Sequence, residues 1–244
     1  MEDLRGFNII FGITQLFGIV TVIFVAILTA HYGKGFAWRS DPGREFNWHP
    51  LLMTIGFIYL FGNSIMIYRS LRNLRKYRLK VFHATIHTVV VVCVIIALVA
   101  VFDSHNLKTP PIPNLYTLHI FFSLLLIKST FLTFFFYFQW ALGILVYLYP
   151  GGSLQIRSAM MSYHVFFGLT IFVCAVAAAL TGLMEKAIFS VGNYGSLPAE
   201  GVLFNLTGLF FIIFAGLVVY IVTESKYKRY PRPEDGALLT PTIE

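Results

Sequence analysis

The chain has 244 residues, of which 57% are hydrophobic and only 12% are charged, and its mean hydropathy is +0.76. A soluble domain carries about 25% charged residues, so this composition argues against an ordinary water-soluble domain and indicates a protein that lies in membrane lipid. The formal net charge is +7, but the basic residues lie in short stretches between apolar runs, which argues against a nucleic-acid-binding protein.

Apolar runs follow one another along the whole chain. They cover residues 8–31, 49–68, 81–102, 117–149, 160–183 and 201–223. About 20 residues of helix cross a hydrocarbon core about 30 Å thick, and the runs lack the alternation of barrel strands. We therefore predict an all-α polytopic membrane protein, with six transmembrane helices over residues 1–225 and a cytoplasmic tail over residues 226–244.

The fourth run, residues 117–149, is too long for one crossing of the bilayer. As a single helix it would measure roughly 50 Å. It also carries Lys128 inside the span with no evident acidic partner, which is costly in lipid. The sequence therefore predicts that this helix tilts, bulges or extends beyond the bilayer.

The distribution of basic residues predicts the orientation. The segment 69–80 has no acidic residue, and the next loop on the same side contributes Arg157. The tail adds further lysines and arginines, whereas the loops on the opposite side mix both signs of charge. By the positive-inside rule, the basic side is cytoplasmic, and both termini are expected there.

Four consecutive predicted helices, the second to the fifth, each carry a histidine about one turn inside the membrane, at alternating ends. These histidines are His49, His83, His119 and His164. Because neighbouring helices run antiparallel, we expect His49 and His119 in the outer leaflet and His83 and His164 in the inner one. A lone histidine in a span is more often an interhelical hydrogen-bonding residue, but two pairs matched in depth indicate a functional site.

Two imidazoles per site, without a nearby carboxylate or cysteine, favour one class of metal centre. Zinc and di-iron sites use more protein ligands, whereas a haem iron needs only two because the macrocycle provides the other four. Ligation on both faces favours electron transfer over oxygen chemistry. His87 lies four residues after His83 on the same helical face and competes with it. Because His83 is nearer the membrane edge, we expect His83 to be the ligand and His87 to be a core histidine beside the haem.

The sequence resembles the cytochrome b-561 family of ascorbate-dependent transmembrane electron carriers. The resemblance covers about residues 30–223 and rests on the segments 35–38 (GFAW), 46–50 (FNWHP), 80–83 (KVFH), 104–106 (SHN), 114–119 (NLYTLH), 163–168 (YHVFFG) and 182–186 (GLMEK). It implies a homodimer of chains that each hold two b-type haems in the central four-helix bundle of helices two to five. In that bundle, it implies that His49 and His119 ligate one haem, and that His83 and His164 ligate the other.

The sequence departs from the family's pattern after His119. Ile120 and Phe121 stand where the family has Ser-Trp, and about six additional residues precede the Gln139–Trp140 pair. Six residues rotate the following part of a helix by well over half a turn, so we expect the haem contacts after His119 to differ from those of the family. Part of 120–138 is therefore either tolerated as an extension or mis-assembled sequence, and continuous transcript reads across it would exclude the second interpretation.

Basic residues are expected to converge above the inner haem. They are Lys76, Lys80 and Arg157, and a positive funnel there attracts an anionic reductant such as ascorbate. Positive-inside topology alone would also supply such charges, and the resemblance favours Lys80 and Arg157 more than Lys76. On the outer face, the resemblance points to His105 and Asn106 as receivers of the acceptor, which it implies to be monodehydroascorbate or a ferric complex.

The sequence thus predicts an oxidoreductase that carries electrons from cytoplasmic ascorbate to a non-cytoplasmic acceptor. The alternative is a histidine-lined proton or metal transporter without haem, which would show acidic residues or broken helices at mid-membrane. A purely structural scaffold leaves the depth-matched histidines unexplained. In the tail, Glu234 precedes the pair Leu238–Leu239, a spacing that favours an endosomal or lysosomal membrane over the plasma membrane.

Overall fold

The computed structural model describes residues 5–114, 131–149 and 151–230, and every regular element in these ranges is a helix. The α-helices are α1 (Arg5–Ile27), α2 (Pro42–Glu45), α3 (Trp48–Leu52), α4 (Phe61–Ser70), α5 (Lys76–Asn106), α7 (Phe131–Tyr147), α8 (Leu154–Ser190) and α9 (Ala199–Thr223). Two π-helical segments are η1 (Leu28–Tyr32) and η2 (Met53–Leu60), and two 3₁₀ turns are η3 (Tyr194–Ser196) and η4 (Ser225–Tyr227).

Five continuous helical segments are long and apolar enough to cross a membrane. They are Gly6–Tyr32, Pro42–Ser70, Lys76–Asn106, Leu154–Ser190 and Ala199–Thr223, and a shorter apolar helix covers Phe134–Tyr147. The prediction of an all-α, multi-pass membrane protein is therefore confirmed. The observed helices are longer than the apolar runs, because the hydrogen-bond ladder of a helix continues into the polar residues that flank the hydrocarbon core.

The predicted fourth helix is described only in its second half. Residues 115–130, which include His119 and Lys128, lie outside the described residues. From Phe131 the chain forms α7, whose 17 residues measure about 26 Å. This described part is therefore of ordinary length.

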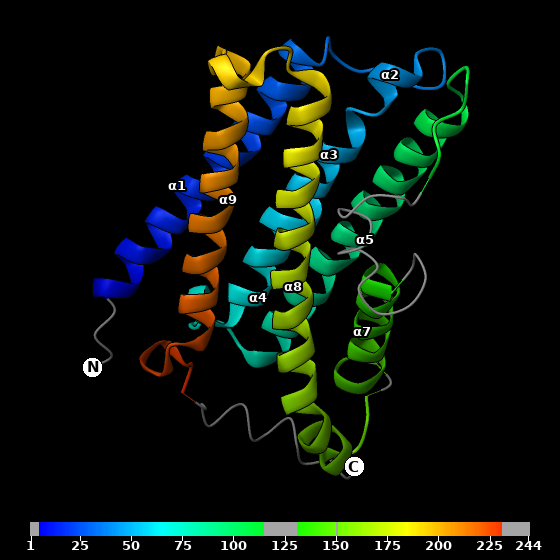
Figure 1. Ribbon diagram of the computed structural model, residues 1–244. Helices are drawn as coiled ribbons and strands as arrows, with labels where there is room; N and C mark the ends of the chain where they lie inside the picture. Colours follow the sequence, from blue (N-terminus) through cyan, green and yellow to red (C-terminus); the bar gives the residue numbers. More distant parts are fainter. Residues whose placement is uncertain (1–4, 115–130, 150, 231–244) are drawn as a thin grey trace.

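Figure 1 shows the helices in three groups across the bundle. At one edge, α1 lies beside α9, and at the other edge α5 lies beside α7. Between them, η2 contacts both α5 and α8, and α8 in turn contacts α7 and α9. The segments η2, α5, α7 and α8 therefore surround a common interior, which buried aromatic side chains fill, among them Phe57, Phe61, Phe136 and Phe172.

The two ends of the bundle carry different loops. At the lower end of Figure 1, α4 is followed by α5 and α7 by α8, and α9 ends there. We call this the basic end, because its described residues include Arg69, Arg72, Arg75, Lys76, Arg78, Lys80, Arg157, Lys226, Lys228 and Arg229. The opposite end, which we call the outer end, carries the loops 33–41, 107–114 and 191–198. The side of the membrane on which each end lies stays a prediction.

The first residues of the predicted tail pack back onto the bundle. The Tyr227 side chain is buried, and its ring meets that of Phe7 edge-on with centroids 5.2 Å apart. Arg229 donates a hydrogen bond from Nε to the main-chain oxygen of Arg72, at 3.2 Å. The boundary after residue 225 stays a prediction, and Glu234, Leu238 and Leu239 lie outside the described residues.

Candidate functional site

His83 of α5 and His164 of α8 meet inside the bundle near the basic end. Their ring centroids lie 6.2 Å apart, and the ring planes are inclined at 65°. These two residues are 81 positions apart in the chain, so only the packing of the helices brings them together. The structure thus unites the two histidines that the sequence pairs by depth.

A main-chain carbonyl determines which nitrogen of His83 carries the proton. His83 Nδ1 lies 3.0 Å from the main-chain oxygen of Ser64 and 3.1 Å from Ser64 Oγ. The hydroxyl donates to the main-chain oxygen of His83, at 3.1 Å, and a carbonyl oxygen only accepts hydrogen bonds. The proton of a neutral His83 therefore sits on Nδ1, and Nε2 presents its lone pair. This is the arrangement in which a carbonyl group orients a metal-binding imidazole, so His83 would suit ligation of a haem iron.

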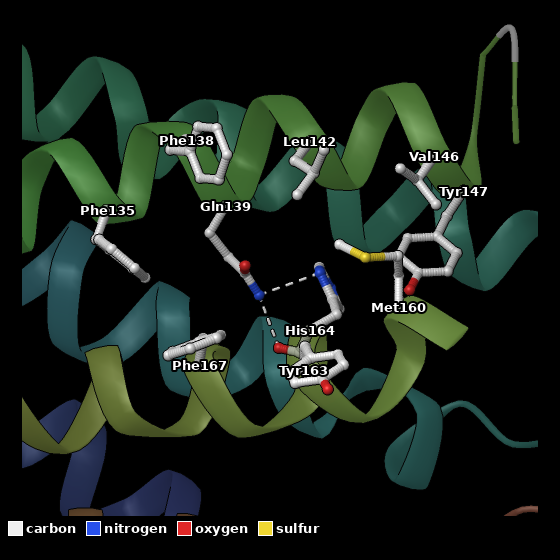
Figure 2. A pocket seen from close by; sticks show the side chains of 10 residues that line it. All are labelled: Phe135, Phe138, Gln139, Leu142, Val146, Tyr147, Met160, Tyr163, His164 and Phe167. Atoms are coloured by element: carbon white, nitrogen blue, oxygen red, sulfur yellow. Dashed lines mark hydrogen bonds between the residues drawn. The ribbon is translucent and has the colours of Figure 1, made fainter. Parts of the chain in front are cut away.

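The surroundings of His164 are provided mainly by α7. Figure 2 shows the amide nitrogen of Gln139 facing this histidine, 3.1 Å from Nδ1 and 2.7 Å from the main-chain oxygen. Gly143 lies one turn further along α7, where a Cβ atom would approach His164 Cε1 to 3.1 Å. A cavity of about 170 Å³ adjoins the ring. It is lined mostly by apolar side chains, namely Phe135, Phe138, Gln139, Leu142, Val146, Tyr147, Met160, Tyr163, His164 and Phe167.

His87 lies directly beside this pair. Its ring meets that of His83 edge-on at a centroid distance of 4.5 Å, and that of Phe61 at 4.7 Å. The side chain is buried, and Nδ1 has no hydrogen-bond partner among the residues that the structure describes. A buried imidazole with an unpaired nitrogen is costly in a purely apolar core. This orphaned atom, together with the two facing imidazoles, fits an interior that accepts a haem group.

His49 provides one half of the predicted outer centre. Its Nδ1 lies 3.2 Å from the main-chain oxygen of Ala97 on α5, which places the proton of a neutral ring on Nδ1, as in His83. The predicted partner of His49, His119, lies outside the described residues. His49 is therefore oriented as a ligand would be, and its pairing stays a prediction.

The segment before His49 is anchored to the outer loop by two side chains. Asn47 donates from Nδ2 to the main-chain oxygens of Gly33, at 2.8 Å, and Gly35, at 2.6 Å. Trp48 donates from Nε1 to the oxygen of Ala37, at 2.9 Å. Asn47 and Trp48 therefore hold the outer loop in place, and the next residue, His49, points into the bundle.

The outer end carries an aromatic and polar cluster around Phe46. The Phe46 ring stacks on that of His105 with centroids 6.3 Å apart, and the Lys186 ammonium group lies 4.8 Å from the Phe46 centroid. His105 Nδ1 lies 3.0 Å from Oδ1 of Asn114, whose Nδ2 donates to Asn106 Oδ1 at 2.9 Å. The predicted pair of His105 and Asn106 is therefore joined through Asn114.

Sequence reasoning did not assign Phe46 and Lys186 to this site, although both lie in the segments that carry the family resemblance. An ion pair lies at the same end. Arg39 Nε is 2.7 Å from Asp103 Oδ2, and this hydrogen bond raises the pKa of the exposed Arg39 guanidinium above its ordinary value.

Two of the three predicted ascorbate-binding residues, Lys80 and Arg157, both contact Tyr147, the last residue of α7. Lys80 donates from Nζ to the main-chain oxygen of Tyr147, at 3.1 Å, and the Tyr147 hydroxyl donates to the main-chain oxygen of Arg157, at 3.4 Å. Arg157 and Lys76 lie close enough to Lys80 for their positive charges to repel its ammonium group. The ring of Tyr147 also lies 5.2 Å from that of His164. Tyr147 is therefore a common neighbour of Lys80, Arg157 and His164.

Known proteins are similar to this chain over most of its length. Residues 48–190 match the sequence model of eukaryotic cytochrome b561. The chain is 39% identical to the plasma membrane ascorbate-dependent reductase CYBRD1 of Xenopus tropicalis, over 100% of this chain and 84% of the relative. It is 40% identical to the human transmembrane ascorbate-dependent reductase CYB561, over 92% of this chain and 86% of the relative. A putative homologue of that reductase in Caenorhabditis elegans is 34% identical, over 97% and 90%. The chain belongs to the eukaryotic cytochrome b561 family.

Proposed function

We propose that this protein is a transmembrane oxidoreductase that takes electrons from ascorbate on one side of a membrane and delivers them to an acceptor on the other. The observation that carries the proposal is the His83–His164 pair, with ring centroids 6.2 Å apart inside a membrane-spanning bundle. The relatives named above are ascorbate-dependent reductases, and their similarity extends over nearly the whole chain.

Two b-type haems supply the one-electron chemistry when bound. His83 and His164 hold the inner haem, and His49 with His119 holds the outer one. The fixed proton on Nδ1 of His83 and of His49 leaves Nε2 of each ring available to a metal. The chain thus contributes ligands, an apolar interior and a separation between two sites, rather than a reactive side chain.

Ascorbate binds at the basic end. It carries one negative charge at neutral pH, and Lys80, Arg157 and Lys76 provide a converging positive field that raises its rate of arrival. The Lys80 ammonium group is held by the main-chain oxygen of Tyr147. This hydrogen bond keeps the charge of Lys80 near His164. These residues therefore bind the donor and orient it toward the inner site.

The acceptor binds at the outer end, near His105 and Asn106. Monodehydroascorbate and ferric complexes both accept a single electron, so either completes the reaction. We assign the basic end to the cytoplasm, with both termini there, and we favour an endosomal or lysosomal membrane and a homodimer. These assignments rest on the charge distribution, on the tail sequence and on the family.

One experiment distinguishes the proposed oxidoreductase from the alternative, a histidine-lined transporter without haem. The full-length protein, purified in detergent, is examined by a reduced-minus-oxidised visible spectrum, with haem counted per chain and ascorbate as the reductant. Two b-type haems reduced by ascorbate are the expected result. A single haem, unaffected by His49→Ala, would restrict the proposal to the inner site, and a haem-free protein would exclude it.

A further inference from the structure

The ring of Phe46 joins three groups of the outer end that come from different elements. Its centroid lies 6.1 Å from that of His49, a candidate ligand of the outer haem, and 6.3 Å from that of His105 on α5. The ammonium group of Lys186, near the end of α8, lies 4.8 Å from the same centroid. One aromatic ring therefore holds a positive charge close to both the predicted acceptor residue and the predicted outer centre.

Lys186 differs from the arginines of this end in its lack of a salt bridge. Arg39 is paired with Asp103 and Arg44 with Asp41, each at 2.7 Å. Within the described part of the chain, Lys186 forms no such pair. The side chain is half-buried, and a half-buried charge acts through a lower effective dielectric than an exposed one. The field of Lys186 is therefore available to a ligand that arrives at the outer end.

Two other charges act on Lys186 from a longer distance. Lys108, in the loop that follows α5, repels its ammonium group, and Glu200, in the first turn of α9, attracts it. The charges that act on one another here are thus two positive and one negative. Both carboxyl oxygens of Glu45 on α2 are buried, so a ligand that reaches the site from solution does not contact them.

The chemistry of these groups favours a small anion. An ammonium group only donates hydrogen bonds, and anionic oxygens accept them. The ring of Phe46 adds an apolar surface, and His105 and Asn106 add polar side chains. A cation would instead be repelled by Lys186 and Lys108. A lysine that merely extends from a helix end toward the membrane surface predicts no such preference between ligands.

We propose that Lys186 determines the specificity of the outer site for anionic electron acceptors, a class that includes monodehydroascorbate and carboxylate chelates of ferric iron. This inference rests on the proposed function, in which an electron leaves the protein at the outer end. The acceptor gains one electron from the reduced protein, so that the ferric iron of a chelate becomes ferrous and the protein returns to its oxidised state. Lys186 binds the anion beside Phe46 and raises its rate of arrival.

Lys34 provides a matched control at the same end. It is an exposed lysine of the loop 33–41, so Lys34→Gln and Lys186→Gln remove the same charge from the same end of the protein. A general effect of net charge therefore appears in both variants. Binding of an anion beside Phe46 should be weakened by Lys186→Gln and should persist in Lys34→Gln. Lys186→Arg keeps the charge and should keep the preference for anions.

The test is stopped-flow reoxidation of the full-length haem-loaded protein, reduced beforehand with dithionite, by acceptors of opposite charge. The anionic acceptor is ferric EDTA, and the cationic one is hexaammineruthenium(III). Lys186→Gln should slow reoxidation by ferric EDTA roughly tenfold and should not slow reoxidation by hexaammineruthenium(III). Equilibrium dialysis with gallium(III) citrate, an anion that takes up no electron, measures binding separately. Lys186→Gln should weaken that binding, and Lys34→Gln should not.

Three results would overturn the inference. One is unchanged reoxidation by ferric EDTA in Lys186→Gln, and another is an equal loss of rate with both acceptors, which would reveal a structural role only. The third is an equal effect of Lys34→Gln. If Lys186→Gln does not retain haem, the unmodified protein decides. Its rate with ferric EDTA should fall as salt is added, because salt screens the attraction, and a constant or rising rate would contradict an anion site. Failure of the proposed function is distinct, since the unmodified protein would then show no haem spectrum at all.

Discussion

His87 packs edge-on against His83, with ring centroids 4.5 Å apart, so two imidazoles of α5 lie next to His164. The hydrogen bond of His83 to Ser64 orients it as a ligand, whereas His87 is packed between aromatic rings. We expect His83→Ala to lower the haem content from two to one per chain, and His164→Ala to have the same effect. His87→Ala should retain both haems with a perturbed inner spectrum. Loss of the inner haem in His87→Ala, with retention in His83→Ala, would reverse the assignment.

Lys80 is expected to control the affinity for ascorbate. Lys80→Gln removes the charge that Tyr147 positions, so the KM for ascorbate should rise roughly tenfold, which corresponds to about 1.4 kcal/mol. Lys80→Arg should retain most of the affinity because the charge remains. The difference between Lys80→Gln and the unmodified protein should shrink at high salt, because salt screens the attraction between Lys80 and ascorbate that approaches from solution.

The control for Lys80 is another lysine at the basic end. Lys226 lies over the ring of Tyr227 rather than near Tyr147, and Lys226→Gln should leave the KM unchanged. The measurement is the rate of haem reduction against ascorbate concentration at two ionic strengths. An equal rise of KM in both variants would mean that only the overall charge of this end matters.

His105 is expected to act only on the acceptor side. It stacks on Phe46 and is linked to Asn106 through Asn114. His105→Ala should slow reoxidation of the haems by a ferric chelate several-fold, while reduction by ascorbate at the other end stays the same. His31 is a second histidine at the outer end, packed against Tyr32, and His31→Ala should change neither rate. A slowed reduction by ascorbate in His105→Ala would contradict the assignment.

The fold class and the proximity of one histidine pair could be predicted from the sequence alone. Long apolar runs dictate helices in lipid, and antiparallel order dictates that histidines at alternate helix ends share a depth. His83 and His164 meet for that reason. The ligand competition with His87 was also foreseeable, because the spacing of four residues places both rings on one face.

Other features depend on three-dimensional packing that no local pattern encodes. The Gln139–His164 hydrogen bond requires the register of α7 against α8, and the fourth run gave no means of predicting that register. The same holds for Lys186 and Phe46, which come from distant segments and meet at the outer end. Five π-helical residues at the end of the first span were likewise not predicted, since apolar periodicity does not distinguish α- from π-helix.

Asn47 is expected to be the main structural support of the outer site. Its buried amide bonds the loop that turns through left-handed residues Lys34, with φ 61°, and Gly35, with φ 85°. Asn47→Ala should cost about 2 kcal/mol of stability, since it removes the amide's hydrogen bonds to the main-chain oxygens of Thr29, Gly33 and Gly35. Asn47→Asp should cost more, because a carboxylate would face carbonyl oxygens. Thermal unfolding monitored at each haem should show the outer haem released first in both variants.

The control for Asn47 is a second amide in the same membrane span. Asn63 donates to the oxygen of Tyr59 and accepts a hydrogen bond from Gln15, so it joins α4 to α1 away from the outer loop. Asn63→Ala should lower the unfolding temperature without selective release of the outer haem. If Asn47→Ala and Asn63→Ala release both haems together, the outer loop does not support His49, and the anchoring role assigned to Asn47 is wrong.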